Sequence, residues 1–357
     1  MWDFIFYQCS VLTFILLYWF HKPKDQTSSS PSNPINQQSS SGEKDQLLTS
    51  KSVESAEIDA SLKTKARQRL TSIRRRKDLV EHEIILSLGL NPDEEGFEAF
   101  CDKFSTFEYV SEALVKAGFC SCDMIIGIDF TASNEWQGKR SFSKNNLHKI
   151  SGSKIFNPYQ KVLQIVGKTL SFLSSDHVIH CYGFGDMETK DHSVFSLQDK
   201  TTHCTDYKEI IDTYTQTAKH IQLSGPTNFA PMIKKGIEYC EKTGKYHVLI
   251  MIVDGQVSSK SEEQTVEAIV RASDYPLSII VIGIGDGPFG TMFEYDDGLP
   301  KRKFDNLQFV NFHRTVTKSK HEAAFALHAL MELPDQYKAI QQLGYLQNHT
   351  VADKKRV

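Results

Sequence analysis

One short stretch of this sequence places three oxygen-bearing side chains at a regular spacing: Asp129, Thr131 and Ser133. They follow the apolar run 124–128, which is too short for a helix and rich in Ile, as strands buried on both faces are. A chain that leaves a strand in extended form directs every second side chain to one side, so one carboxylate and two hydroxyls can converge. Such hard oxygen ligands suit Mg²⁺, Mn²⁺ or Ca²⁺ rather than zinc or copper. Taken alone, the spacing also fits an ordinary turn followed by a helix cap.

Two later residues occupy comparable places in the sequence. Thr227 lies in a Ser-Gly-Pro-Thr loop, and Asp254 follows the continuous apolar run 247–253. If these segments belong to one parallel sheet, the carboxyl ends of its strands meet at a single edge, where ligands bind. Two carboxylates and three hydroxyls would hold Mg²⁺, or Mn²⁺, and leave coordination positions for water and an incoming oxygen. We therefore predict a cation site that a partner's acidic side chain can complete.

The rest of the chain supplies the elements that must position these residues. Apolar, strand-like runs alternate with helical segments, and both Asn157-Pro158 and Asp206 fit the start of a helix. This alternation predicts an α/β fold, with a doubly wound, mostly parallel sheet flanked by helices. The expected strands are 123–130, 178–185, 194–197, 247–253, 277–285 and 307–312, and the expected helices start at 157 or span 206–221, 231–242, 261–273 and 322–333.

The first hundred residues differ in composition from the rest. Residues 4–20 carry no charge, and basic residues follow them, so we expect an N-terminal membrane anchor over 1–22 with a cytoplasmic domain behind it. A cleaved signal and a cytoplasmic protein are the alternatives. Residues 23–55, rich in Ser, Asn and Gln, predict a disordered linker. Residues 56–94 predict a basic helical segment, whose part 63–77 could contact anionic lipid or form a solvated helix face.

Composition limits the possible partners and the compartment. The formal net charge is −3, so the whole chain lacks the basic signature of nucleic-acid binding, and we expect no nucleic-acid partner. The seven cysteines are scattered, which argues against a disulfide framework and for a reducing compartment. Nothing in the sequence indicates an oligomeric state.

Ten ordered motifs carry a family resemblance. The first reads Gly-Ile-Asp-Phe-Thr-Ala-Ser-Asn-Glu-Trp over 127–136. Together the motifs resemble the copine-type von Willebrand factor A domain, above all the version in plant copine-like RING ubiquitin ligases. The resemblance covers 95–335, which leaves 336–357 as a C-terminal helix and tail. The other motifs lie at 138–142, 157–159, 182–186, 223–231, 246–249, 254–256, 275–279, 283–287 and 304–312.

The resemblance implies a metal-ion-dependent adhesion site. In that family the first Asp, two following hydroxyl residues, the Thr of the Gly-Pro-Thr loop and the later Asp hold the metal. Carried over, these ligands are Asp129, Thr131, Ser133, Thr227 and Asp254.

The same resemblance guides three expectations about function. Copines carry calcium-binding C2 domains and the copine-like ligases a RING finger, and neither module is expected in this sequence. We therefore expect a membrane-anchored, non-enzymatic adaptor that captures an acidic residue of a protein partner through Mg²⁺. The alternative is a RING-less subunit or substrate receptor of the ubiquitin pathway. An enzyme of Mg²⁺-dependent phosphoryl transfer fits less well, because Thr131 stands where the related phosphatases carry a second Asp.

Overall fold

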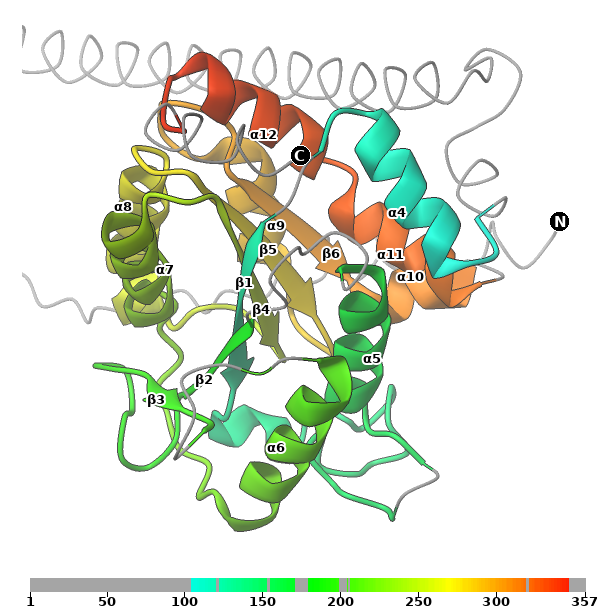
Figure 1. Ribbon diagram of the computed structural model, residues 1–357. Helices are drawn as coiled ribbons and strands as arrows, with labels where there is room; N and C mark the ends of the chain where they lie inside the picture. Colours follow the sequence, from blue (N-terminus) through cyan, green and yellow to red (C-terminus); the bar gives the residue numbers. More distant parts are fainter. Residues whose placement is uncertain are drawn as a thin grey trace, which may run out of the picture. The chain divides into compact units, whose positions relative to one another are not determined.

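Six strands form one sheet in the order β3-β2-β1-β4-β5-β6 (Figure 1). All neighbouring strands run parallel, except that the short edge strand β3 is antiparallel to β2. This confirms the predicted α/β fold with a doubly wound, mostly parallel sheet. The strands are β1 (Asp123–Asp129), β2 (Ile179–Phe184), β3 (Phe195–Ser196), β4 (His247–Val253), β5 (Leu277–Gly283) and β6 (Leu307–Asn311).

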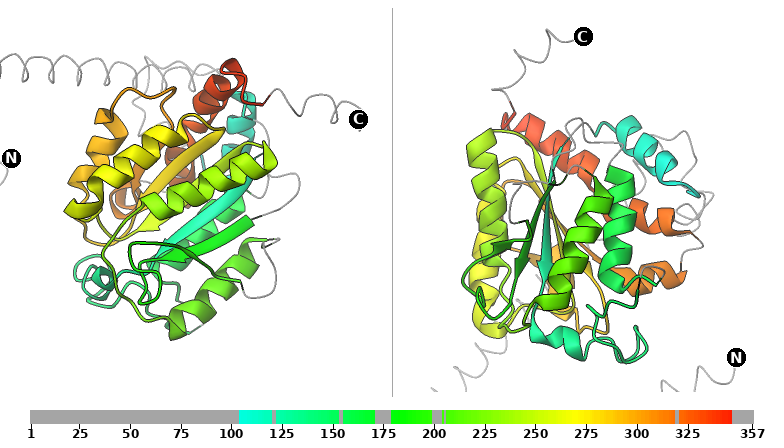
Figure 2. Two further views of the ribbon diagram at one scale, coloured as in Figure 1. Left: turned by 90° about the vertical axis from the view of Figure 1, so that its left-hand side faces the viewer. Right: turned by 60° about the horizontal axis from the view of Figure 1, so that its bottom comes forward.

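The computed structural model describes residues 104–119, 122–152, 155–170, 179–198, 204, 206–318 and 321–346. Within them, helices cover both faces of the sheet, as the right-hand view of Figure 2 shows. The helices are α4 (Phe107–Lys116), α5 (Pro158–Leu170), α6 (Tyr207–His220), α7 (Ala230–Thr243), α8 (Glu262–Ala272), α9 (Gly290–Gly298), α10 (Phe312–Lys318), α11 (Glu322–Leu330) and α12 (Leu333–Gln342), with 3₁₀ turns η1 (Ala132–Glu135) and η2 (Ser259–Ser261).

The apolar strands are buried because both faces of the sheet are covered. Every residue of β4 and β5 is buried, as the continuous apolar runs predict for a parallel sheet. Successive side chains of β1 enter different layers: Ile126 and Ile128 belong to the core under α4, α5 and α11, and Ile125 to the core under α7 and α8. This alternation fixes the register of β1, and so fixes the point where Asp129 leaves the sheet.

Local sequence signals set two helix starts as expected. The Asn157 and Gln160 side chains each accept a hydrogen bond from the other residue's backbone amide, at 2.9 and 3.0 Å respectively, which is a reciprocal cap at the start of α5. Asp206 accepts from the amides of Lys208 and Glu209 at the start of α6. These caps matter for function because α5 contributes side chains to the site described below.

The C-terminal part departs from the sequence expectation. The helix predicted over 322–333 is α11, which ends at Leu330, and the predicted C-terminal helix is α12, which starts at Leu333 with Pro334 in its first turn. The boundary predicted at residue 335 falls inside α12, whose Tyr337 contacts the rings of Phe119 and Tyr246. Helices α9 and α10 have no counterpart in the prediction. Both are short, and α9 mixes Gly with acidic residues, so neither shows helical periodicity in the sequence.

The expectation of a membrane-anchored protein is corrected. The longest helices in the described part, α6 and α7, have 14 residues each, whereas a membrane-spanning helix needs about 20 apolar residues. No helix among the described residues is long and apolar enough to cross a bilayer. The residues predicted as the anchor, 4–20, and the basic stretch 63–77 lie outside the described residues.

Close packing of α5 on α6 gives a test of the fold. A Cβ added at Gly167 would lie 2.4 Å from the Cβ of Tyr207. The better helix propensity of Ala would gain about 1 kcal/mol, but the overpacking costs about 1–3 kcal/mol. We expect Gly167→Ala to lower the free energy of unfolding in urea. Gly298→Ala is the control, because a Cβ there has no atom within 4 Å. Equal effects of the two changes would contradict the packing described here.

Candidate metal site

The strand order reverses direction between the neighbours β1 and β4. In a doubly wound sheet, ligands bind at the carboxyl ends of the strands beside such a switch point. Asp129 ends β1 and Asp254 directly follows β4. The chain leaves β1 so that the backbone amide of Thr131 donates to Asp129 Oδ1 at 2.8 Å. The hydroxyls of Thr131 and Ser133 lie 2.9 Å apart. The side chains converge, but through the 3₁₀ turn η1, which contains Ser133, and not through the extended chain that the spacing predicts.

The two carboxylates lie inside the protein. Asp129 is fully buried and Asp254 is 1 % exposed, and the Oδ2 atom of each has no hydrogen-bond partner among the described residues. Burial raises the pKa of Asp129 to about 6, although hydrogen bonds from Thr131 act in the opposite direction. Burial and the Asp129 charge raise the pKa of Asp254 well above its usual range, while a hydrogen bond from Ser133 lowers it. Both carboxylates thus lack a positive partner.

The Thr227 loop lies beside the β1 loop. The Ala132 amide donates to the Ser224 carbonyl oxygen at 2.6 Å. A Cβ on Gly225 would lie 3.8 Å from both the methyl carbon of Thr131 and the Thr227 amide nitrogen. The Thr227 amide donates to the Ser258 hydroxyl at 3.0 Å, which ties this loop to the chain that follows Asp254. The structure therefore brings the three predicted segments together, and it positions Thr227 through its backbone.

This donor set fits a divalent cation with oxygen ligands. Two unpartnered buried carboxylate oxygens are costly unless a proton or a cation compensates them. In the part of the chain that the structure describes, no group of three or more His, Cys, Asp or Glu side chains is arranged to hold a metal. The candidate site therefore depends on two carboxylates plus the hydroxyls of Thr131, Ser133 and Thr227, which suits Mg²⁺ or Mn²⁺. The five residues remain a prediction for metal binding.

A buried polar network binds the backbone carbonyl of Asp129 at the end of β1. The Tyr159 hydroxyl lies 2.8 Å from both the Asp129 carbonyl oxygen and Asn134 Oδ1. Asn134 Nδ2 donates to the carbonyls of Asp129 and Thr131, at 3.2 and 3.0 Å. His148 Nε2 lies 2.9 Å from the same Asp129 carbonyl oxygen. Asp129 is therefore positioned through its own backbone.

The hydrogen bonds assign the tautomer of His148. Burial lowers its pKa to about 3, so the ring is neutral. A carbonyl oxygen only accepts, so Nε2 carries the proton donated to Asp129, and Nδ1 accepts from the Tyr214 hydroxyl at 2.9 Å. Tyr214 in turn accepts from Asn157 Nδ2 at 3.0 Å. Sequence reasoning missed His148 and Tyr214, because no local spacing connects them with Asp129.

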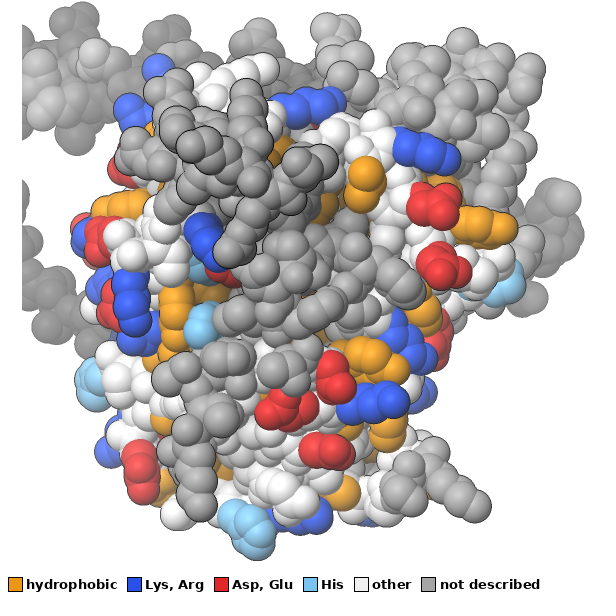
Figure 3. Space-filling view, in the orientation of Figure 1, with side chains coloured by type: hydrophobic (Ala, Val, Ile, Leu, Met, Phe, Trp, Pro, Cys, Tyr) orange, Lys and Arg blue, Asp and Glu red, His pale blue; other side chains and the backbone are white. Residues whose placement is uncertain are grey.

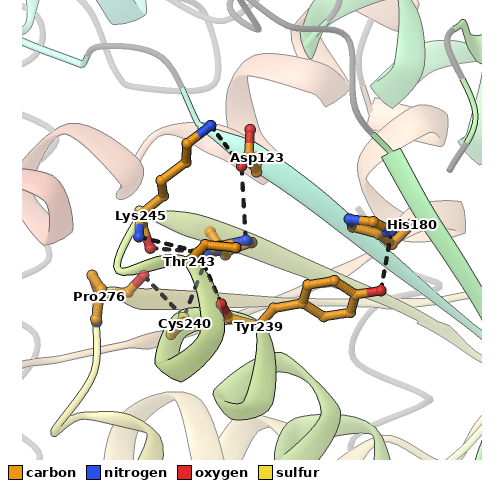
Figure 4. Close-up of polar contacts among 8 residues, drawn as sticks. Asp123, His180, Tyr239, Cys240, Thr243, Lys245 and Pro276 are labelled. Carbon is orange, nitrogen blue, oxygen red and sulfur yellow. Dashed lines mark hydrogen bonds and ion pairs between the residues drawn. The ribbon is translucent and has the colours of Figure 1, made fainter. Parts of the chain in front are cut away.

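A second polar cluster lies at the amino ends of the central strands β1 and β4. Figure 4 shows its contacts. There His247 Nδ1 lies 3.7 Å from Cys240 Sγ, and His247 Nε2 lies 3.9 Å from an oxygen of Asp123. The order Cys-His-Asp resembles a nucleophilic triad, but the contacts do not fit one. His247 Nδ1 lies closer to the Lys245 carbonyl oxygen, at 3.0 Å, and the thiol donates to the Pro276 carbonyl oxygen. Burial raises the pKa of Cys240, so the thiol stays protonated.

Comparison with known proteins agrees with the fold and the motifs. The family model described as Copine matches residues 146–349, more than half of the chain. This chain belongs to the copine family. The match confirms the predicted resemblance, and it begins after Ser133, so three of the proposed ligands precede the matched segment.

The relatives come from two groups. The E3 ubiquitin-protein ligase RGLG5 of Arabidopsis thaliana is 46% identical over 72% of this chain and 62% of its own length. Copine family protein 2 of Caenorhabditis elegans is 45% identical over 69% of this chain and 3% of its own length. The chain thus spans less than two thirds of RGLG5. Among solved structures, the SpRpn10 VWA domain is 13% identical, with a TM-score of 0.39 over 56% of this chain and 96% of that one.

Charge burial at the site predicts how stability depends on pH. A raised carboxyl pKa means that the folded protein binds more protons than the unfolded chain. For metal-free protein, the contribution of Asp129 is most favourable below the ordinary pKa of 3.8 and is lost as pH rises through about 6. Asp254→Asn removes one of the two charges. In EDTA near neutral pH it should raise the free energy of unfolding by about 1–3 kcal/mol.

Urea unfolding with and without Mg²⁺ measures this effect. Mg²⁺ should stabilise the natural protein and have little effect on Asp254→Asn, because a neutral amide is a weaker ligand. The decline in stability as pH rises from the ordinary carboxyl pKa of 3.8 through about 6 should also be smaller in the variant, because only one carboxylate still loses its proton there. A variant that is less stable than the natural protein in EDTA would contradict the account of unpaired buried charge.

The network behind Asp129 gives a second prediction. Tyr159→Phe removes the hydroxyl that contacts Asp129 and Asn134, so we expect a loss of about 1–2 kcal/mol in stability and weaker Mg²⁺-dependent stabilisation. Tyr246→Phe is the matched control, since the buried Tyr246 hydroxyl donates to Ser278 at 2.8 Å near the opposite edge. It should cost similar stability and leave the Mg²⁺ effect unchanged. If the two variants respond equally to Mg²⁺, Tyr159 does not position the site.

Proposed function

We propose that this copine-family chain is a protein-binding adaptor, whose cation site captures an acidic side chain of a partner. The observation that carries the proposal is the pair of buried, unpartnered oxygens, Asp129 Oδ2 and Asp254 Oδ2. Their position at the switch in strand order is where this class of sheet presents ligands. A protein partner fits better than a buried small molecule, because the ligand-bearing loops also carry the exposed residues Trp136 and Pro226.

The residues of the site have separate tasks in this proposal. Asp129 and Asp254 supply the two negative charges, and the hydroxyls of Thr131, Ser133 and Thr227 complete the ligand set. When bound, Mg²⁺ supplies a positive centre that keeps a position for a carboxylate oxygen of the partner. Asn134 and Tyr159 hold the backbone of Asp129 so that its carboxylate keeps its direction. Low local dielectric strengthens the attraction between such a centre and an incoming carboxylate.

A second candidate function has one observation in its favour. The 46% identity to the ligase RGLG5 covers 72% of this chain, so the chain could recruit substrates for ubiquitination through the same site. Such a role needs a ubiquitin-ligase partner or domain in addition to the acidic ligand. Affinity capture with Mg²⁺ present distinguishes the two, because co-purified ubiquitin-ligase subunits favour recruitment and their consistent absence favours a plain adaptor.

The adaptor proposal is tested by replacing the first carboxylate. Asp129→Ala should abolish capture of partner proteins from cell extracts in Mg²⁺, and EDTA should do the same to the natural protein. Asp206→Ala is the control: it removes the cap of α6, at a cost of about 1 kcal/mol in stability, and should keep Mg²⁺-dependent capture. Capture that survives both EDTA and Asp129→Ala contradicts the proposal.

A further inference from the structure

Five exposed basic residues lie in three segments at the carboxyl ends of the strands, the end of the sheet that carries the candidate metal site. Three lie in the loop after η1 and are exposed, and the others lie on α5 and α10. We call them the cationic surface: Lys139, Arg140, Lys144, Lys161 and Arg314. The segments are far apart in sequence, so only the tertiary structure shows that these charges share one side of the molecule.

A partly buried carboxylate, Asp286, holds the loop that carries three of these residues. Asp286, just after β5, accepts hydrogen bonds from the backbone amides of Arg140 and Ser141, both at 2.9 Å. The partly buried His313 of α10 interacts electrostatically with both Asp286 and Lys161. Asp286 therefore fixes the backbone of the loop at Arg140 and Ser141, and His313 lies close enough to feel the charges of both Asp286 and Lys161.

Asp286 does not neutralise the cationic surface. Its side chain is only 9 % exposed, and its oxygens already accept backbone amides. The Arg140 guanidinium lies 3.8 Å from it but is 84 % exposed, so this charge is available to solvent. Glu135 is the exposed acidic residue at the border of this loop. The surface therefore keeps an excess of positive charge.

The cationic surface is continuous with the metal site. Gln137 accepts a hydrogen bond from the Asp286 amide at 2.8 Å, and its Nε2 would lie 3.8 Å from a Cβ on Gly255, the neighbour of Asp254. Trp136, which directly precedes it, is 49 % exposed, and its amide donates to the Ser133 carbonyl oxygen. One extended ligand can therefore touch the metal loop, the indole of Trp136 and the first lysines in succession.

The acidic turns of α6 lie away from the site. Acidic side chains gather over the first turns of α6 (Figure 3), where Glu209 and Asp212 follow the capping Asp206. This helix starts next to Cys204, which pairs with Ile179 at the amino end of β2. Its last turn carries Lys219 and His220 and leads to Ser224, which pairs with Thr131 beside the site. The negative charge of α6 therefore does not compete with the cationic surface at the carboxyl ends of the strands.

We propose that the partner is an acidic protein segment, in which one carboxylate faces the metal site and the following acidic residues bind the cationic surface. This inference rests on the proposed function and deepens it, because it specifies which residues must follow the coordinating one. Surface ion pairs are individually weak, so each pair should tighten binding only roughly two- to fivefold. Several together distinguish an acidic segment from a lone Asp or Glu.

The test measures binding of two synthetic peptides to the full chain in Mg²⁺ by fluorescence anisotropy. One peptide has a single Asp flanked by Ser and Gly, and the other has three Glu residues after that Asp. We expect the acidic peptide to bind about tenfold tighter, with a steeper loss as salt rises. The double variant Lys139→Gln/Lys144→Gln should lose roughly three- to tenfold in affinity for the acidic peptide and nothing for the single-Asp peptide.

A matched control for the loss of charge is available at the amino ends of the strands. Lys116 and Lys242 are exposed near the last turns of α4 and α7, so Lys116→Gln/Lys242→Gln removes the same net charge far from the site. This control should bind both peptides as the natural protein does. Equal losses in the two double variants would reduce the effect to net charge and overturn the inference.

The outcomes separate this inference from the proposed function. Mg²⁺-dependent binding of both peptides with equal affinity overturns the cationic surface and leaves the metal site standing. Binding that ignores EDTA and Asp129→Ala but still needs Lys139 and Lys144 supports the surface and contradicts the metal mechanism. Failure of both peptides to bind rejects both proposals. If Lys139→Gln/Lys144→Gln loses binding to phosphatidylserine vesicles and keeps its peptide affinity, the surface binds lipid and the inference is wrong.

Discussion

Two carboxylates buried side by side, at the point where the strand order turns, are the constraint on which the rest of this structure depends. No salt bridge among the described residues reaches Asp129 or Asp254, and each has one oxygen without a hydrogen-bond partner. Such a pair is destabilising in a low dielectric unless a proton or cation compensates it. The fold accepts this cost at a single edge, and the remaining elements hold that edge in place.

The support for this edge comes from polar groups that are themselves satisfied. The Asp129 carbonyl oxygen has three side-chain partners, from Asn134, His148 and Tyr159. His148 also stacks between Phe130 and Tyr159, with ring centroids 4.7 and 4.2 Å away. A network of this kind keeps its geometry because every rearrangement would leave a buried polar group unpaired. The segments that follow β1 and β4 can therefore hold the unpaired carboxylates of Asp129 and Asp254 in fixed positions.

The two ends of the sheet show that the surroundings of a polar side chain decide what chemistry it can do. At the amino end of the strands, Cys240, His247 and Asp123 lie close together, yet burial and backbone acceptors keep the thiol protonated. At the carboxyl end, Asp129 Oδ2 and Asp254 Oδ2 have no hydrogen-bond partner among the described residues. Both groups of residues are largely buried, so what separates the two ends is whether the surrounding backbone satisfies the polar atoms.

The sequence by itself determined the fold class, the bounds of the six strands to within two residues, and the place of Asp129 at the end of β1. It could do so because buried parallel strands need apolar runs. The hydroxyls of Thr131 and Ser133 meet for another reason, because Ser133 lies in the 3₁₀ turn η1 and not in an extended chain. It did not reveal α9 and α10, or the roles of His148, Tyr214 and Asp286. Those three roles depend on contacts between residues 19 to 146 positions apart, and no local pattern encodes them. Only the tertiary structure decided which side of the site is positive, because Lys161 and Arg314 join the loop charges through folding alone.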